Sequence, residues 1–362
     1  MRVLVLAADY PNNNGGVTLM YIHARNRVYI KQGIEVDVLN FNSDDCYDYE
    51  GVNVITLAEY KKKNPQYDVL ISHAPNLRNH YRFLKRYGDK FPRFIFFFHG
   101  HEVLKIRDTY STPYPYIKNR GFSNSFIQDV YDACKLSVWR KYYPTVACKS
   151  QFVFVSGWMY NKFKKYVKIE TPKDRTYIIP NNVGTVFEKN NYDQKSKKDY
   201  DFVTIRSNLD GSKYSIDIVN RIAKENPEYK FLVVGQGKFF EYYEKADNIE
   251  WINGSLPHKE IPKILNRARC ALMPTRLDAQ GVMMCEMATY GIPLMTSDID
   301  ICQEISTLLD NVIMISNSER VNLKEFDCKI EELAALPKNS YFFEENTVGK
   351  EISIIKGLEL DA

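Results

Sequence analysis

The sequence predicts an α/β fold of two doubly wound, Rossmann-like domains, and three observations support this prediction. The chain has 362 residues, more than one ordinary hydrophobic core accommodates. Short, almost continuously apolar segments alternate with helical patterns in both halves, which is typical of parallel sheets covered on both faces. A polar, lysine-rich segment at 188–200 separates the two series and is expected to be a linker.

The first half begins with a strand, a turn, a helix and a second strand. Apolar residues at helical spacing over 17–33 end at Gly33, and a β-type run at 34–41 follows them. Further strands are expected at YDVLISHA, RFIFFFHG, QFVFVSG and TYIIPNN. We therefore place the first domain at 1–187.

The second half shows the same alternation of strands and helices after the linker. Strands are expected at DFVTIRS, KFLVVGQG, NIEWING, CALMPT, PLMTS and VIMIS. Helical patterns at 215–225 and 259–268 and around Glu286 lie between them. We place the second domain at 201–340 and a C-terminal piece at 341–362.

Composition restricts the class of protein. The chain is 44% hydrophobic and 26% charged, as in globular proteins, and its net charge of +4 does not indicate nucleic-acid binding. The seven cysteines form no CxxC pair and fit a reducing cytoplasm better than a disulfide framework or a zinc site. The apolar runs, including the one before Asp9, are too short for a signal-peptide core or a membrane span. A cytoplasmic protein is expected.

Two glycines, Gly15 and Gly16, lie between the first strand and the first helix. Their small size would let backbone N–H groups approach a phosphate at a helix N-terminus. The alternative is that they serve only the turn.

A buried-looking strand ends in FFFHGHE, which contains His99, His101 and Glu102. Catalytic groups often follow the carboxyl ends of strands in doubly wound sheets, although a hydrogen-bonded core histidine is the alternative. A metal site is rejected because the sequence signals no fourth ligand.

A pair of cations, Arg206 and Lys213, follows the first strand of the second half. The planar guanidinium of arginine can donate two parallel hydrogen bonds, and the lysine ammonium is a point charge, so the two side chains suit a pyrophosphate. The alternative is that they are an ordinary pair of surface charges.

The segment RLDAQGVMMCEMATYGIP places Glu286 among apolar and aromatic neighbours at helical spacing. A carboxylate removed from water needs a partner. Asp278 lies before this helix, either as an acid favoured by the helix dipole or facing a ligand, and Gly281 would let a backbone N–H approach a ligand.

The order of these elements resembles a retaining GT-B glycosyltransferase of the large family numbered four, the glycosyl transferases group 1. The residues that carry the resemblance are the glycine pair, His99, the segments VFVSGWM and YIIPNNV, Arg206 with Lys213, and an acid pair eight residues apart. It implies two Rossmann-like domains facing across a cleft, with a C-terminal helix at 341–362 returning to the first domain.

The resemblance also implies roles for the acidic pair and its neighbours. Glu286 would accept hydrogen bonds from the ribose hydroxyls of a nucleotide sugar. Asp278, where the family usually has glutamate, would contact the transferred sugar as a catalytic residue. Gly281 would lie beside the bound donor.

For the other residues the resemblance implies contacts with the diphosphate and the sugar. Gly15 and Gly16 would lie near the diphosphate and the acceptor, and His99, rather than His101, near the transferred sugar. Arg206 and Lys213 would bind the phosphates, although they are seven residues apart and the family spacing is about five.

The implied activity is retaining transfer of a hexose or N-acetylhexosamine from a nucleotide diphosphate sugar, with UDP the expected nucleotide. The acceptor would be a hydroxyl of a glycan or lipid-linked saccharide in cell-surface polysaccharide biosynthesis. The donor's leaving phosphate would take the acceptor proton, without metal or other cofactor. The triplet Asp298-Ile-Asp300 lies away from where a metal-dependent enzyme would use it and is interpreted as chance.

Basic residues alternate with aromatic ones at 78–93, 139–144 and 158–168. This composition suits an anionic membrane surface, on the inner face of the cell membrane, or a lipid-diphosphate acceptor. A solvated helix face is the alternative, and the glycosyltransferase elements disfavour single-stranded nucleic acid.

Two other functions remain open. A GT-B-shaped nucleotide-sugar epimerase would release its product without an acceptor. A non-catalytic glycosyltransferase-like partner subunit would explain an aspartate at 278. A periplasmic sugar-binding protein is disfavoured because no signal peptide is expected.

Overall fold

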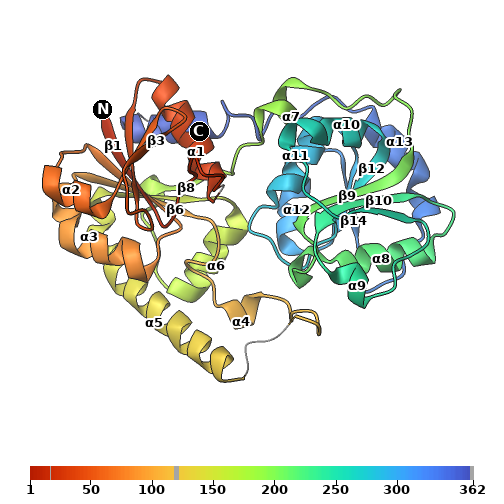
Figure 1. Ribbon diagram of the computed structural model, residues 1–362, viewed down its shortest axis with the longest axis horizontal. Coiled ribbons are helices and arrows are strands. Elements are labelled where there is room, and N and C mark those ends of the chain that lie inside the picture. Colours follow the sequence, from red (N-terminus) through yellow and green to blue (C-terminus); the bar gives the residue numbers. More distant parts are fainter. Residues whose placement is uncertain (17, 118–121, 359–362) are drawn as a thin grey trace. The chain divides into compact units, whose positions relative to one another are not determined.

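The computed structural model describes residues 1–16, 18–117 and 122–358, and these residues form two compact units (Figure 1). Unit 1 comprises the described residues of Met1–Ile106, Ile127–Asn181 and Thr347–Ala362. Unit 2 comprises those of Arg107–Phe126 and Asn182–Asn346. Both are α/β, which confirms the predicted fold class.

Unit 1 is built on an eight-stranded sheet of order β3-β4-β2-β1-β5-β6-β7-β8. All neighbours are parallel except the β3–β4 hairpin, which the sequence analysis did not predict. The strands are β1 (Arg2–Ala7), β2 (Glu35–Asn40), β3 (Tyr47–Tyr49), β4 (Val52–Ile55), β5 (Val69–His73), β6 (Arg93–Phe98), β7 (Ser150–Phe154) and β8 (Thr176–Ile178).

Helical elements connect the parallel strands, as a parallel sheet requires, except the last one, which follows unit 2 in the chain. They are α1 (Met20–Lys31), α2 (Leu57–Lys63), the π-helix η1 (Leu77–Tyr81), α3 (Arg82–Tyr87), α4 (Ile106–Thr109), α5 (Phe122–Val146), α6 (Gly157–Val167) and α14 (Val348–Lys356), with short 3₁₀ turns η2 (Gly88–Lys90), η3 (Ala147–Lys149) and η4 (Lys173–Arg175). Helix α1 begins later than predicted, and Val17 lies outside the described residues.

Unit 2 is built on a six-stranded parallel sheet of order β11-β10-β9-β12-β13-β14. The strands are β9 (Tyr200–Asn208), β10 (Phe231–Gln236), β11 (Ile249–Ile252), β12 (Ala268–Leu272), β13 (Leu294–Ser297) and β14 (Val312–Ile315). The helices are α7 (Thr185–Lys189), α8 (Ile216–Glu225), α9 (Phe239–Tyr242), α10 (Ile261–Asn266), α11 (Val282–Tyr290), α12 (Asp300–Ser306) and α13 (Asp327–Ala334), with 3₁₀ turns η5 (Ser212–Tyr214), η6 (His258–Glu260) and η7 (Leu323–Phe326).

Each sheet reverses its winding direction beside its first strand. In unit 1 the chain adds β2 on one side of β1 and β5 on the other, and in unit 2 it adds β10 and β12 on opposite sides of β9. In such sheets ligands bind beyond the carboxyl ends of the strands at this reversal. The reversal points therefore locate the region to search in each unit.

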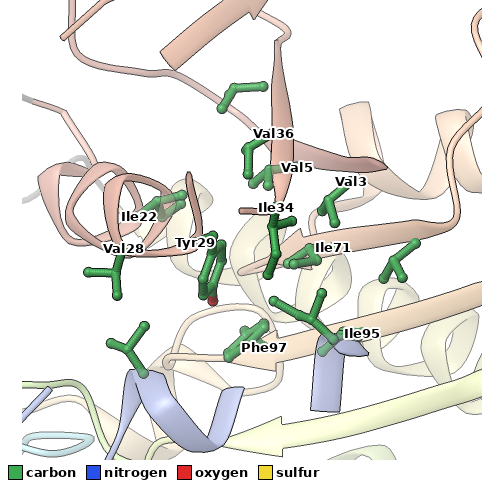
Figure 2. Close-up of a cluster of buried hydrophobic side chains, with 14 of the residues drawn as sticks. Val3, Val5, Ile22, Val28, Tyr29, Ile34, Val36, Ile71, Ile95 and Phe97 are labelled. Carbon is green, nitrogen blue, oxygen red and sulfur yellow. The ribbon is translucent and has the colours of Figure 1, made fainter. Parts of the chain in front are cut away.

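Helix α1 packs on the unit 1 sheet through one cluster of buried apolar side chains. Figure 2 shows side chains from the helix and from the strands in this cluster, among them Ile22, Tyr29, Val5, Ile71 and Phe97. Unit 2 has its own core, which joins α8 to the strands through Ile218, Ile222 and Phe231. Each unit thus has a core of its own, as the two-domain prediction requires.

The unit boundaries differ from the predicted domains 1–187, 188–200 and 201–340. The segment expected to be a linker packs into unit 2, where the Tyr192 hydroxyl donates to the Ala268 carbonyl at 2.8 Å and Lys198 Nζ donates to the Asn266 carbonyl at 2.9 Å. Its polar residues thus bind the backbone of unit 2, a contact that composition alone does not reveal.

The segment 107–117 also belongs to unit 2, although it interrupts the sequence of unit 1. The Tyr114 hydroxyl donates to Asp217 at 2.7 Å, and the Tyr116 hydroxyl donates to Asp210 at the same distance. These hydrogen bonds, together with stacking of Tyr116 on Tyr242, hold the segment on unit 2.

The last helix, α14, lies in unit 1 beside α1 and begins at Val348 rather than near 341. A buried ion pair joins the two helices, because Arg25 Nε lies 3.0 Å from Glu351 Oε1 and both side chains are fully buried. The Tyr29 hydroxyl donates to Glu351 at 2.5 Å, and Arg25 donates to Asn181 Oδ1 at 2.8 Å. In the described ranges, no helix is both long and apolar enough to span a membrane.

Replacing Glu351 by alanine should lower the free energy of unfolding by about 3–5 kcal/mol, because Arg25 would stay buried without its counter-charge. Urea unfolding followed by circular dichroism measures the change. The exposed Glu35→Ala should stay within about 0.5 kcal/mol of the parent, and equal effects of the two substitutions would contradict the assignment.

Candidate functional site

Arg206 lies on β9, next to the strand β12, at the reversal point of unit 2. Its Nη2 donates to the carbonyls of Met273 and Pro274, at 3.3 and 2.8 Å, in the chain that follows β12. The side chain is buried, and its Nε has no hydrogen-bond partner. Burial lowers the pKa of Arg206, which the Asp278 carboxylate opposes.

This guanidinium is an uncompensated buried charge. No carboxylate in the described ranges lies within ion-pair distance of Arg206. A buried charge without a partner is costly, and arginine presents a planar fork that fits phosphate oxygens. The position is therefore suited to an anion.

Lys213 lies in η5, seven residues after Arg206, and shares an aromatic neighbour with it. The Tyr214 ring lies 5.2 Å from the Arg206 guanidinium carbon and 4.6 Å from Lys213 Nζ. The Lys213 side chain is half-buried and has no hydrogen bond or ion pair with any residue in the described ranges. Both predicted cations thus lie beside the same aromatic ring, that of Tyr214, which the sequence analysis did not identify.

Asp278 and Gly281 lie in the turn that starts α11. The Asp278 carboxylate accepts from the Ala279 N–H at 2.8 Å, and Gly281 has the left-handed φ of +73°. A Cβ on Gly281 would approach the end of Met284 to 2.1 Å. The left-handed conformation therefore favours glycine here, whereas the Met284 methyl group could move aside for a Cβ.

Glu286 is buried on α11, with 3% of its surface exposed, as its apolar neighbours in the sequence indicated. Its Oε1 accepts from the Gly184 N–H at 3.4 Å and lies 3.9 Å from His258 Nδ1. No residue in the described ranges hydrogen-bonds to its Oε2. Burial raises the pKa of Glu286 from 4.5 to about 8, and the Gly184 N–H opposes this rise.

Gly184 and His258 are functional candidates that the sequence analysis missed. Burial lowers the pKa of His258, so this imidazole is neutral near pH 7 and forms no ion pair with Glu286 there. A Cβ on Gly184 would lie 3.6 Å from Glu286 Oε1 and 3.3 Å from the His258 ring. No sequence signal links these three residues, because they come from segments more than twenty residues apart.

In unit 1, His99 follows β6 and meets His73, the last residue of β5. His99 Nε2 lies 3.1 Å from His73 Nδ1, and the Tyr21 ring of α1 lies 4.8 Å from that of His99. Burial and then the nearby Arg25 charge lower the pKa of His99. His73 was missed, although it stands at the carboxyl end of a predicted strand, the signal used for His99.

The Glu102 carboxylate accepts from the backbone N–H groups of His99 and Gly100. Glu102 therefore shapes the turn after β6. His101 is exposed and lies in the same turn.

The glycine pair serves a turn whose N–H groups are already engaged. Asn12 Oδ1 accepts from the N–H groups of Asn14 and Gly16, at 2.9 and 3.2 Å, and the Asn12 carbonyl accepts from Gly15. Gly15 has a φ of +90°, whereas a Cβ on Gly16 would overlap the Asn12 amide. The turn alternative thus accounts for both glycines, and a phosphate contact would require Asn12 to exchange partners.

Glu286→Gln should change how stability depends on pH. A carboxyl whose native pKa is about 8 holds its proton while the unfolded chain loses it above 4.5, so its stabilising contribution is complete below pH 4.5 and is lost as pH rises toward 8. The wild type should lose up to about 1.4 kcal/mol per pH unit in this window relative to the variant.

Urea unfolding at pH 5 and pH 8 checks this prediction, with the exposed Glu319→Gln as the control, which should follow the wild type at both values. A constant difference between Glu286→Gln and the wild type at the two pH values would show that the native carboxyl does not titrate in this range.

The solved structures similar to this chain include glycosyltransferases. Sucrose-phosphate synthase from Thermosynechococcus elongatus has a TM-score of 0.69 at 12% identity and covers 98% of each chain. WaaG, a glycosyltransferase involved in lipopolysaccharide biosynthesis, has a TM-score of 0.60 at 15% identity and covers 98% of this chain and 100% of its own. An α,α-trehalose-phosphate synthase (UDP-forming) from Burkholderia vietnamiensis has a TM-score of 0.61 at 10% identity, and the match covers 98% of this chain and 95% of that structure's chain. At these identities the similarity establishes the fold.

Sequence comparisons concern the second half. A curated relative, the gpi3 subunit of phosphatidylinositol N-acetylglucosaminyltransferase of Schizosaccharomyces pombe, is 26% identical over 136 residues, which are 34% of this chain and 29% of the relative. The match thus covers less than a third of that relative. Residues 202–333 match the family model of glycosyl transferases group 1. Residues 202–333 are thus a glycosyl transferases group 1 domain, in a chain that has the GT-B fold.

Proposed function

We propose that this protein is a retaining glycosyltransferase that binds a nucleotide diphosphate sugar in unit 2. The observation that carries the proposal is the pair of buried ionisable side chains, Arg206 and Glu286, which have no ionic partner in a group 1 domain. The donor would supply both partners: phosphate oxygens for the guanidinium and ribose hydroxyls for the carboxylate.

Arg206 and Lys213 would bind the diphosphate. The Arg206 Nε is a spare donor in a buried position, and hydrogen bonds to ionised groups are stronger in such an environment. As the sugar–phosphate bond breaks, negative charge grows on the leaving diphosphate, and these cations would stabilise it.

Glu286 would accept hydrogen bonds from the two ribose hydroxyls. Its Oε2 is the oxygen that no described residue occupies, and the Gly184 N–H already fixes Oε1. A vicinal diol presents two donors to a carboxylate shielded from water, and each such bond contributes about 1.5–3 kcal/mol. Asp278 and Gly281 at the start of the same helix would lie beside the transferred sugar.

The acceptor hydroxyl would attack the same face of the sugar that the diphosphate leaves. The bond from the anomeric carbon to the phosphate oxygen breaks, the bond to the acceptor oxygen forms, and the acceptor proton passes to the departing phosphate. Configuration is thereby retained. The neutral His99 would contact the sugar, and no metal or further cofactor takes part.

We propose UDP as the nucleotide, a hexose or N-acetylhexosamine as the sugar, and a glycan or lipid-linked saccharide as the acceptor. The names of the similar proteins support this choice: one is UDP-forming, one is an N-acetylglucosaminyltransferase acting on phosphatidylinositol, and one takes part in lipopolysaccharide biosynthesis. On the same grounds we propose a role in cell-surface polysaccharide biosynthesis.

The proposed location is the cytoplasm, peripherally on the inner face of the cell membrane. Helix α6 supports it, because the ammonium groups of Lys162 and Lys164 lie 5.0 and 4.6 Å from the ring centres of Trp158 and Tyr160. Cations held beside aromatic rings suit an anionic lipid surface.

Calorimetric titration with UDP, GDP, ADP and CMP, without added metal, tests the donor site. One nucleotide should bind, and Glu286→Ala should weaken its binding about ten- to a hundredfold, because a charged hydrogen-bonded contact is lost. The exposed Glu319→Ala should bind like the parent. Binding that is unchanged in Glu286→Ala would contradict the ribose assignment, and absence of any binding would favour a non-catalytic partner subunit. Release of an epimerised free sugar nucleotide without acceptor would instead indicate an epimerase.

Nucleotide affinity should also rise with pH toward about 8, the pKa of Glu286 in the free protein. Two hydroxyl donors bind the ionised carboxylate, so each pH unit below this pKa should cost up to about tenfold in affinity. Titrations between pH 6 and 9 should show this slope for the wild type and lose it in Glu286→Gln. An affinity that falls with pH in the wild type alone would contradict the role of Glu286.

A further inference from the structure

Unit 1 contains a pocket of about 270 Å³ that the sequence analysis did not identify. It lies between α2 and the η1–α3 segment, with Phe41, the residue after β2, in its wall. The elements around it follow the carboxyl ends of β2, β4 and β5, the edge of a parallel sheet where ligands bind. Its lining consists of Phe41, Leu57, Lys61, Arg78, Asn79, Arg82, Phe83, Arg86 and Tyr87.

Four cations line this pocket, and no acidic residue lines it. Lys61, Arg78, Arg82 and Arg86 make no ion pair and no side-chain hydrogen bond with any residue that the structure describes. Nearby Lys63, which does not line the pocket, is paired with Glu59 at 2.8 Å. The unpaired charges are therefore concentrated around the pocket.

The three arginines are spaced four residues apart through η1 and α3, at 78, 82 and 86. Like charges at this spacing destabilise a helix. The segment also contains a π-helical turn, Leu77–Tyr81, and such turns are frequent at functional sites. This arginine stripe (Arg78, Arg82 and Arg86) lowers the stability of the helix, and no described residue of the chain neutralises it. An external anion that binds the three arginines would account for this arrangement.

Aromatic rings give the pocket a second chemical character. Phe83 lies 6.1 Å from Phe41 and 5.0 Å from Tyr87, measured between ring centres. The Arg86 guanidinium carbon lies 5.6 Å from the centre of the Tyr87 ring. Rings beside a cluster of guanidinium groups suit a ligand that combines a sugar ring, with its apolar C–H face, and a phosphate.

We infer that this pocket binds the phosphate-bearing part of the acceptor, a phosphorylated saccharide. This inference rests on the proposed function, because it assigns the acceptor class of that reaction. The arginines bind the phosphate oxygens as forks, the aromatic side chains contact the sugar, and Asn79 offers both a donor and an acceptor to a hydroxyl. The phosphate belongs either to a soluble sugar phosphate or to the diphosphate of a lipid-linked saccharide.

Calorimetric titration with glucose 6-phosphate, with glucose as the neutral probe, tests the soluble source. Flotation with phosphatidylcholine vesicles, with or without phosphatidic acid, tests the lipid source. Arg78→Gln/Arg82→Gln should weaken binding of the phosphate probe that binds the wild type by about tenfold or more. The matched control Lys62→Gln/Lys85→Gln removes the same charge from exposed positions of α2 and α3 outside the pocket, and should bind like the wild type.

Removing the arginine stripe relieves repulsion, so the double arginine variant should melt at the same temperature as the wild type or higher, and its loss of binding would not reflect unfolding. Binding of glucose 6-phosphate that the arginine variant loses assigns a soluble acceptor. Binding only to phosphatidic acid vesicles, if the arginine variant loses it, assigns a lipid-linked one, whereas vesicle binding through α6 would persist in that variant. The inference is overturned if neither phosphate probe binds, if glucose binds equally well, or if the lysine control loses as much binding as the arginine variant.

The same variants separate this inference from the proposed function. The arginine variant should bind nucleotide as the wild type does, and Glu286→Ala should bind the phosphate probe as the wild type does. If no nucleotide binds while the phosphate probe still depends on the arginines, the transferase proposal fails and the anion site stands. If the nucleotide binds and the phosphate probe does not, the acceptor assignment alone is wrong.

Discussion

The buried ion pair between Arg25 and Glu351 is the interaction on which unit 1 depends. It fastens the last helix to the first, and the apolar side chains of the last helix pack in the same core, so the C-terminal stretch is joined to the rest of a unit made of three separate stretches of chain. The pair is fully hydrogen-bonded, since Tyr29 and Asn181 also bind it, which is the condition under which a buried pair repays its desolvation. The Arg25 charge also helps to keep His99 neutral.

The buried ionisable side chains of unit 2 are arranged differently. Arg206 is held by backbone carbonyls and a tyrosine ring, and Glu286 by one backbone N–H, but neither has a charged partner near neutral pH. Core stability gains nothing from this arrangement. It is suited to a ligand that carries both phosphate oxygens and hydroxyl donors, and this contrast distinguishes the structural ion pair of unit 1 from the proposed donor site.

The arginine stripe of η1–α3 is a third arrangement of charge. Its cations are exposed, so each costs little alone, but their four-residue spacing concentrates one sign of charge around a pocket. Exposed arginines attract an anion from solution, whereas the buried Arg206 holds one in a fixed geometry. The two units thus offer phosphate-binding chemistry of different kinds, which fits a reaction with two substrates.

The sequence by itself determined the α/β class, the parallel strands and the burial of Glu286, because apolar runs and helical spacing are local patterns. Only the tertiary structure decided the packing of 188–200 and 107–117 onto unit 2, the meeting of His73 with His99 and the approach of Gly184 to Glu286. These contacts join segments far apart in the chain, and their hydrogen bonds leave no periodicity to detect. The arginine stripe was visible as a basic segment, but its pocket required the fold to bring β2, α2 and α3 together.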